Sequence, residues 1–289
     1  MSAYGTWRTR DDVDALDHAL YEIVKADPPM TVRQAFYQAT VRGLVPKDES
    51  QGYRVVQRRL VLLRGAGIMP YWWITDSSRT VYGTTRYDGL EDLHRESARL
   101  YRRNYWSNSP VRVEVWIEKD ALSGVLTPVV DDLWGLQLHV TKGFASVSYL
   151  EAAAAHARHD GRPVEVYCLT DLDPSGIGIN ERVEKELKAR APEVDVNVHR
   201  LAVTLEQVRE LSLPTRPTKK TDSRAKKFAA EYGTGSVELD AIPPRVLRTM
   251  VSEAIEQHAD TAEFRRLKQL EQFERESLIN GNGFGGGEA

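Results

Sequence analysis

The spacing of apolar residues predicts helices in the first part of the chain. Apolar side chains recur every three or four residues, as on the buried face of a helix. Thr31 is a residue type that caps a helix N-terminus, and Gly43 is a type that ends a helix. The pattern therefore predicts helices over residues 12–26, 32–42 and 53–64.

A β-hairpin is predicted after these helices. Residues 68–75 are rich in aromatic and β-branched side chains, and Val81 and Tyr82 follow a polar turn as the start of a returning strand. Three helices and a hairpin predict a winged-helix domain, whose third helix usually enters the DNA major groove. We assign this domain to residues 1–106, with a long charged helix over 88–105 at its end.

From residue 107 onward, short apolar runs alternate with helical segments. Strands are predicted over residues 112–118, 136–140, 163–171 and 195–201. Helices are predicted over residues 121–133, 146–158, 178–191, 243–258 and 261–278. This alternation predicts an α/β domain over residues 107–279, with a mostly parallel sheet that helices cover on both faces. The Gly-rich residues 280–289 are predicted to be a flexible tail.

The composition predicts a soluble cytoplasmic protein. Of the 289 residues, 41% are hydrophobic and 28% are charged, which is typical of globular chains and not of disordered ones. Cys168 is the single cysteine, which excludes a disulfide scaffold and a cysteine-based zinc cluster. We find no apolar signal segment at the N-terminus and no apolar run of membrane-spanning length. No membrane partner is therefore expected.

The net charge of −3 hides an uneven distribution. Residues 31–79 carry eight Lys and Arg against three acids, whereas residues 111–210 carry 11 Lys and Arg against 17 acids. A second basic patch covers residues 215–227. Such asymmetry suits a protein that binds double-stranded DNA through one part and cations through another. The alternative is that both regions are ordinary solvated surfaces. The candidate DNA contacts are Arg54, Arg58, Arg59, Lys119, Lys219 and Lys220.

Acidic residues follow two of the predicted strands. Glu118 ends the strand in VEVWIE, and Asp171 and Asp173 end the strand in VYCLTDLD. Ligand sites of α/β sheets lie at the carboxyl ends of strands, and residues two apart in an extended chain point the same way. Three such carboxylates predict a Mg²⁺ or Mn²⁺ site that holds a phosphate. The alternative is that these acids cap helices or end solvated loops.

The same residues carry a resemblance to a known family. A strand ending in Glu followed by a strand ending in DxDPxG resembles the Toprim domain of topoisomerases, primases and some nucleases. The ordered blocks VEVWIEKDALSGVL, TKGFASVSYL, CLTDLDPSGIGI and VELDAIPP resemble those of the topoisomerase VI A subunit and of the related meiotic double-strand-break transesterase. In that family a winged-helix domain precedes Toprim and carries a nucleophilic tyrosine in a block that TVRQAFYQ resembles. The resemblance covers about residues 31–259.

The resemblance implies a DNA-cleaving transesterase of the type IIB topoisomerase kind. It makes Tyr37 the nucleophile that forms a 5′-phosphotyrosyl DNA intermediate, with Arg33 and Glu118 as further catalytic residues. It also implies a homodimer, in which Tyr37 works with the Toprim metal of the other subunit. We recognise no ATPase domain in this chain, so strand passage would require a separate B-like ATPase subunit. A nucleoid-associated place in the cytoplasm is expected.

The chemistry of tyrosine agrees with this implication. A free phenol has a pKa of about 10 and needs a nearby cation to act as a phenolate nucleophile. Arg33 lies four residues before Tyr37, on the same face of the predicted helix. The alternative for Tyr37 is an ordinary core residue beside Phe36. Two further functions stay open: a Toprim metal-dependent nuclease that uses water, and a non-catalytic DNA-binding or assembly subunit.

Overall fold

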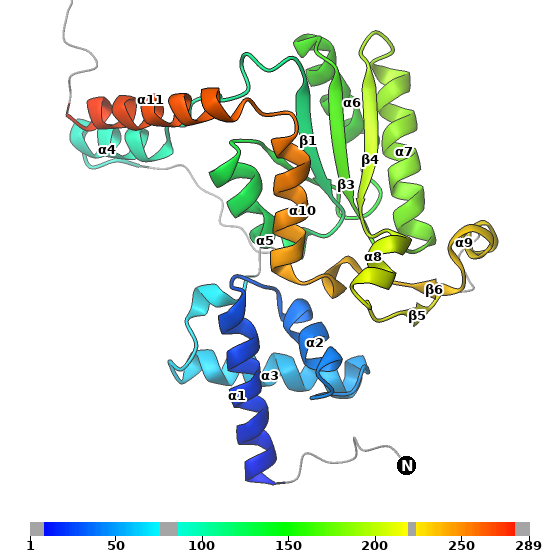
Figure 1. Ribbon diagram of the computed structural model, residues 1–289. Coiled ribbons are helices and arrows are strands. Elements are labelled where there is room, and N and C mark those ends of the chain that lie inside the picture. Colours follow the sequence, from blue (N-terminus) through cyan, green and yellow to red (C-terminus); the bar gives the residue numbers. More distant parts are fainter. Residues whose placement is uncertain (1–8, 76–85, 219–223, 281–289) are drawn as a thin grey trace, which may run out of the picture.

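The computed structural model describes residues 9–75, 86–218 and 224–280 (Figure 1). A group of helices at the N-terminus lies beneath an α/β part that is built around a parallel sheet. Two helices from distant parts of the sequence, α4 (Leu90–Leu100) and α11 (Thr261–Ile279), lie side by side as an arm that projects from the α/β part.

The N-terminal helices have the order that the sequence predicts. They are α1 (Arg10–Ala26), α2 (Val32–Val41) and α3 (Arg54–Gly65), with the π-helical turn η1 (Glu49–Tyr53) directly before the third. A capping box fixes the start of α2: the Thr31 hydroxyl accepts the Gln34 backbone N–H at 3.1 Å, and the Gln34 side chain accepts the Thr31 N–H at 2.9 Å.

The hairpin expected after α3 is not found in the described residues. Residues 68–75 form the 3₁₀ turn η2 (Tyr71–Trp73) and a single parallel bridge between Met30 and Ile74. Pro70 precedes this turn, and its fixed φ and missing N–H favour a turn over a paired strand. The expected returning strand lies outside the described residues, so the winged-helix assignment stays a prediction.

The α/β part confirms the predicted parallel sheet. All four strands are parallel, in the spatial order β2 (Leu138–Val140), β1 (Arg112–Ile117), β3 (Val164–Leu169) and β4 (Val196–Ala202). Strands β1 and β3 are direct neighbours that pair over their whole length. Their carboxyl ends therefore meet at the same edge of the sheet.

Helices cover both faces of this sheet, as expected. The covering helices are α6 (Val147–Asp160) and α7 (Pro174–Arg190) on one face, and α5 (Ser123–Thr127) and α10 (Pro244–Glu256) on the other. Trp116 packs with α6 and α7, whereas its neighbours Val115 and Ile117 belong to the opposite core. Because successive strand residues point to opposite faces, a nearly continuous apolar strand fills both cores.

Three helices differ clearly from their predicted bounds. The charged helix expected over 88–105 is α4, which ends at Leu100. The expected helix over 121–133 is divided into the 3₁₀ turn η3 (Asp120–Leu122), α5, and the π-helical segment η4 (Pro128–Leu133). The change falls at Pro128, which has no N–H to continue an α-helical ladder. Helix α7 begins at Pro174 and not at 178, because Asp173 caps it.

The C-terminal third joins the two parts of the molecule. Its remaining elements are α8 (Leu205–Glu210), β5 (Arg216–Pro217), α9 (Ala225–Tyr232), β6 (Gly235–Ser236) and the 3₁₀ turn η5 (Leu239–Ala241). Helix α2 packs against η5, and one apolar cluster runs from the N-terminal helices into the α/β part. Among the described residues, the helices lack the combination of length and apolar character that crossing a membrane requires.

Candidate functional site

The predicted acidic edge of the sheet is present. Glu118 directly follows β1, and Asp171 lies just beyond β3. The Asp171 backbone N–H donates to the Glu118 carboxylate at 3.3 Å, so two residues that are 53 positions apart in sequence are neighbours in space. The parallel pairing of β1 with β3 brings about this contact.

The Glu118 carboxylate lies in an unfavourable environment for a negative charge. Burial raises the pKa of Glu118 to about 7, and the charge of Asp171 and, to a smaller extent, that of Asp173 act in the same direction. The N–H of Asp171 and the charge of Lys119 oppose this shift without cancelling it. A bound cation would relieve the repulsion between these carboxylates.

Asp173 has a structural task in addition to its predicted metal role. Its Oδ1 accepts the backbone N–H of Gly176 at 2.7 Å and so caps α7. A Cβ on Gly176 would lie 2.1 Å from the backbone oxygen of Asp171, so only glycine lets the helix start this close to the strand end. The capping alternative for Asp173 is therefore correct for one oxygen, and its role as a metal ligand stays a prediction.

The donor atoms fit a hard divalent cation better than a softer metal. The described residues contain no group of three or more His, Cys, Asp or Glu side chains arranged to hold a metal ion. Glu118 and Asp171 nevertheless offer carboxylate oxygens at one edge, and Mg²⁺ is commonly bound through one or two carboxylates together with water and phosphate. The donor set is thus compatible with Mg²⁺ or Mn²⁺.

Lys119 pairs with carboxylates of its own chain at the wall of the cleft, and its role as a DNA contact stays a prediction. Its Nζ lies 2.6 Å from Asp240, 3.0 Å from Asp171 and 3.6 Å from Glu238. Burial disfavours the charged form, but Asp240, Asp171 and Glu238 outweigh it, and the pKa of Lys119 is raised. These three carboxylates therefore stabilise the charged form of Lys119.

Sequence reasoning missed Glu238 and Asp240 as site residues. They flank the start of η5 in the block VELD, and Asp240 is only 1% exposed. The Thr31 hydroxyl lies 3.5 Å from Asp240, and the guanidinium of Arg33 donates two hydrogen bonds to the Glu238 carboxylate. Two signals were available: both acids lie in the block VELDAIPP that carries part of the family resemblance, and their Glu-x-Asp spacing repeats the Asp-x-Asp spacing of residues 171–173.

Tyr37 is buried beside this network. Its side chain on α2 is 1% exposed, and the guanidinium of Arg216 lies 5.4 Å from the centre of its ring. Burial raises the pKa of Tyr37, and Glu238 raises it further, whereas Arg216 and Arg33 act to lower it. In this conformation Tyr37 is a neutral, enclosed phenol. Its predicted role as nucleophile is not tested by this geometry.

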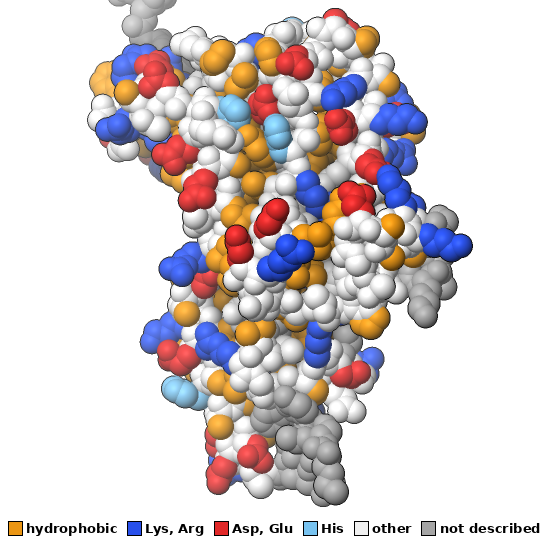
Figure 2. Space-filling view, turned by 45° about the vertical axis from the view of Figure 1, so that its right-hand side comes forward, with side chains coloured by type: hydrophobic (Ala, Val, Ile, Leu, Met, Phe, Trp, Pro, Cys, Tyr) orange, Lys and Arg blue, Asp and Glu red, His pale blue; other side chains and the backbone are white. Residues whose placement is uncertain are grey.

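A cleft of about 830 Å³ opens beside this network. Its walls come from the start of α2, the start of α3, the ends of β1 and β3, and residues 238–240. Arg33, Glu118 and Asp171 all line it. On the face shown in Figure 2, acidic and basic side chains are interspersed with hydrophobic ones and are not gathered by sign.

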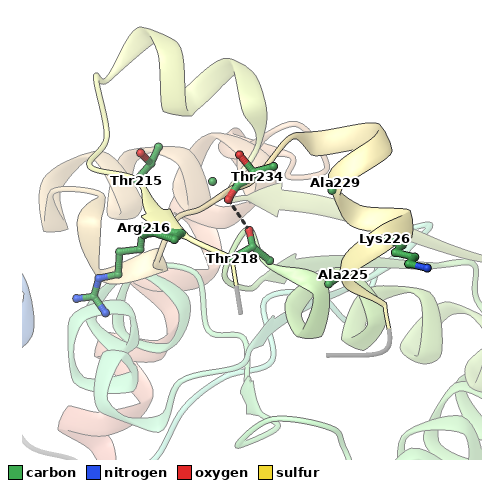
Figure 3. A pocket seen from close by; sticks show the side chains of 9 residues that line it. Thr215, Arg216, Thr218, Ala225, Lys226, Ala229 and Thr234 are labelled. Atoms are coloured by element: carbon green, nitrogen blue, oxygen red, sulfur yellow. Dashed lines mark hydrogen bonds between the residues drawn. The ribbon is translucent and has the colours of Figure 1, made fainter. Parts of the chain in front are cut away.

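A second hollow of about 630 Å³ lies between β5, β6 and α9 (Figure 3). Small side chains line much of it, and the Thr218 hydroxyl donates to the backbone oxygen of Thr234 at 2.9 Å. The side chain of Arg216 extends away from this hollow, and it reaches Glu238. Of the catalytic candidates, Arg33 and Glu118 line the first cleft, whereas Tyr37 is buried beside it.

The predicted DNA contacts differ in their surroundings. Arg54 and Arg58 are exposed on α3, whereas Arg59 forms a two-pronged ion pair with Asp17. Lys219 and Lys220 lie outside the described residues. The structure thus leaves Arg54 and Arg58 as the accessible pair on the third helix.

The chain matches no protein-family model, and no curated protein is significantly similar to it. The fold and the site therefore define a class only. The chain is a mixed α/β protein with a four-stranded parallel sheet, whose acidic edge opens into a cleft between the sheet and the N-terminal helices.

The raised pKa of Glu118 predicts a pH-dependent stability difference. The carboxyl group has a pKa of about 7 in the folded protein and 4.5 as its ordinary value, so its ionisation opposes folding increasingly from pH 4.5 to pH 7. Glu118→Gln removes this penalty. At pH 8 it should raise the free energy of unfolding by on the order of 2 kcal/mol, and Tm with it, whereas at pH 4 it should change neither. Thermal melts across pH measure it, and an equal Tm difference at both pH values would contradict it.

Proposed function

We propose that this protein is a DNA-cleaving transesterase of the kind formed by topoisomerase VI A subunits. The observation that carries the proposal is that Arg33, at the start of α2, and the acidic pair Glu118 and Asp171 line the same cleft. Neither feature alone is specific, but a guanidinium and paired carboxylates around one space suit a phosphodiester and a divalent cation.

The residues of the chain have separate tasks in this proposal. Arg33 binds a phosphate oxygen with its planar fork, and Glu118 and Asp171 would hold Mg²⁺ or Mn²⁺. Such a cation, when bound, stabilises the charge that develops on the phosphate. The Tyr37 hydroxyl gives up its proton to water as its oxygen attacks phosphorus, the bond from phosphorus to the 3′ oxygen breaks, and that oxygen leaves and takes up a proton. The 5′ phosphate stays attached to Tyr37.

This reaction requires Tyr37 to leave its buried position, where it is 1% exposed. In the proposed homodimer, the uncovered Tyr37 of one subunit would reach the cleft of the other subunit, where Arg33 lies beside the acidic pair Glu118 and Asp171. Burial of Tyr37 also supports a second candidate, a Mg²⁺-dependent nuclease in which water attacks and Tyr37 is a core residue. A separate ATPase subunit and a nucleoid location remain part of the first proposal.

One assay separates these functions. Supercoiled plasmid is incubated with the protein and Mg²⁺ or Mn²⁺, and the reaction is stopped with SDS before and after protease treatment. DNA breaks with protein on the 5′ ends support the transesterase. Breaks without attached protein support the nuclease. DNA binding without breaks contradicts both and leaves a binding or assembly subunit.

The third helix should contribute phosphate contacts to DNA binding. Arg54 and Arg58 are exposed on α3, so the double variant Arg54→Ala, Arg58→Ala should weaken binding. Removing one arginine–phosphate interaction flattens the slope of log K against log salt by about 0.9. The measurement is fluorescence anisotropy with a 20-bp duplex at several salt concentrations.

A matched control carries the same charge change on the arm. Arg95 and Arg265 are exposed on α4 and α11, and their double Ala variant should keep the wild-type slope. Equal slopes for all three proteins would show that α3 does not dock on DNA.

A further inference from the structure

The carboxylate of Glu238 is held in the way that proteins hold a bound anion. Arg33 donates to it through Nε at 2.6 Å and through Nη2 at 2.9 Å, which is a two-pronged contact. Arg216 donates to the same carboxylate, and Lys119 lies 3.6 Å from it. Burial acts to raise the pKa of Glu238, but these cations outweigh it and lower the pKa to about 2.

The cations around Glu238 come from distant parts of the chain. Arg33 lies on α2, Arg216 on β5, and Lys119 directly beyond β1. Lys47 lies next to this cluster, because its Nζ donates to the backbone oxygen of Thr215, the residue before Arg216. Burial lowers the pKa of Lys47, and the charge of Arg216 lowers it further. The fold thus assembles like charges that repel one another unless an anion lies between them.

This cluster is open to the cleft and adjoins the candidate nucleophile. Arg33, Lys119 and Glu238 line the cleft of about 830 Å³, so an anion from solvent can reach them. Arg216 contacts Glu238 and also covers the ring of Tyr37 at 5.4 Å. A group that displaces Glu238 therefore changes the contacts that enclose Tyr37.

We propose that Glu238 occupies a phosphate-binding site formed by Arg33 and Arg216, as an internal substitute for a phosphate group. A phosphate of a nucleic-acid backbone competes with Glu238 for these guanidinium groups, and its binding uncovers Tyr37. The identity of this phosphate source rests on the proposed function, whereas the site and the competition do not. Fork-shaped guanidinium groups accept carboxylate and phosphate with the same geometry, which makes the exchange possible.

The first test measures phosphate binding without DNA. Glu238→Gln removes the competing charge and nearly preserves the shape, so it should bind inorganic phosphate at least about tenfold more tightly than the wild type, a change of about 1.4 kcal/mol. Titration calorimetry at constant ionic strength measures this. Adding Arg216→Gln to Glu238→Gln should abolish the gain.

Glu274→Gln is the matched control, because Glu274 likewise accepts a hydrogen bond from an arginine, Arg103, but lies on the arm. It carries the same charge change and should bind phosphate like the wild type. Equal phosphate affinity of Glu238→Gln and the wild type, or an equal gain in Glu274→Gln, would overturn the proposal.

The second test follows the exposure of Tyr37 by nitration and mass spectrometry. Trypsin releases residues 34–42 as a peptide in which Tyr37 is the one tyrosine. Nitration of Tyr37 should be slow in the wild type and several-fold faster in Glu238→Gln. Tyr71, which is 69% exposed, and Tyr105, which is 8% exposed, are internal references that should not change. Unchanged nitration of Tyr37 in a folded Glu238→Gln variant contradicts the proposal.

A final arm identifies the source of the phosphate. If the phosphate is that of a nucleic acid, a 20-bp duplex should accelerate nitration of Tyr37 in the wild type. Acceleration by inorganic phosphate without any acceleration by the duplex would overturn the assignment to nucleic acid. Should Glu238→Gln fail to fold, Arg216→Gln takes its place: it should expose Tyr37 and weaken phosphate binding, and failure of both effects would refute the site. The nitration results do not depend on whether DNA is cleaved.

Discussion

Covalent attachment of the protein to DNA is expected to disappear completely in Tyr37→Phe. The substitution removes one oxygen and keeps the ring that packs in the core of the N-terminal helices, where Tyr37 is 1% exposed. Glu238 keeps its contacts with Arg33 and Arg216, so the loss of one hydroxyl should cost only about 0.5–1.5 kcal/mol of stability. Folding and DNA binding should therefore survive while the nucleophile is absent.

The size of the effect separates the possible roles of Tyr37. A nucleophile cannot be replaced by phenylalanine, so both the adduct and the break vanish. If Tyr37 only positions a phosphate while water attacks, cleavage falls by the modest factor that one hydrogen bond supplies. If Tyr37 is a core residue, cleavage hardly changes. Tyr71→Phe is the control, because Tyr71 lies in the same part of the chain and is 69% exposed. Wild-type cutting by Tyr37→Phe refutes the transesterase proposal.

Metal-dependent cleavage is expected to fall by at least about 10²-fold in Glu118→Gln, because a carboxylate that holds the cation contributes several kcal/mol to charge stabilisation. Glu118 is the most informative position for this test. Its substitution leaves an acceptor for the Asp171 N–H, whereas Asp171→Asn would also disturb Lys119 and the hydrogen bond from the Leu239 N–H. Cleavage rates against Mg²⁺ concentration, with the fold checked by circular dichroism, measure the effect.

Asp173→Asn extends the same experiment to the third carboxylate. Asparagine caps helices as well as aspartate does, so α7 should keep its start while the charge is removed. Reduced cleavage in this variant would make Asp173 a ligand as well as a cap, and unchanged cleavage would leave it a cap only. Wild-type cleavage by Glu118→Gln at limiting Mg²⁺ would remove the acidic edge from the mechanism.

Sequence patterns predicted the sheet well and the N-terminal part less completely. The apolar runs of β1 and β3 were unambiguous, because a parallel strand between two helix layers is buried on both faces. The aromatic run before residue 75 was misleading: Pro70 turns the chain, and Trp73 instead packs against Tyr21 of α1, with 5.5 Å between the ring centres. Packing between elements, which periodicity does not contain, decided that segment.

By itself the sequence determined the strand order along the chain, the acids at the ends of two strands, and the start of α2 at Thr31. These features depend on neighbours in the chain: caps, turns and alternation within a few residues. Only the tertiary structure decided that Lys119 pairs with Asp240, and that Glu238 accepts hydrogen bonds from Arg33, which lies 205 positions away in the sequence. Such ion pairs depend on how η5 packs against α2, and burial then sets their strength, so no local pattern of charges could have revealed them.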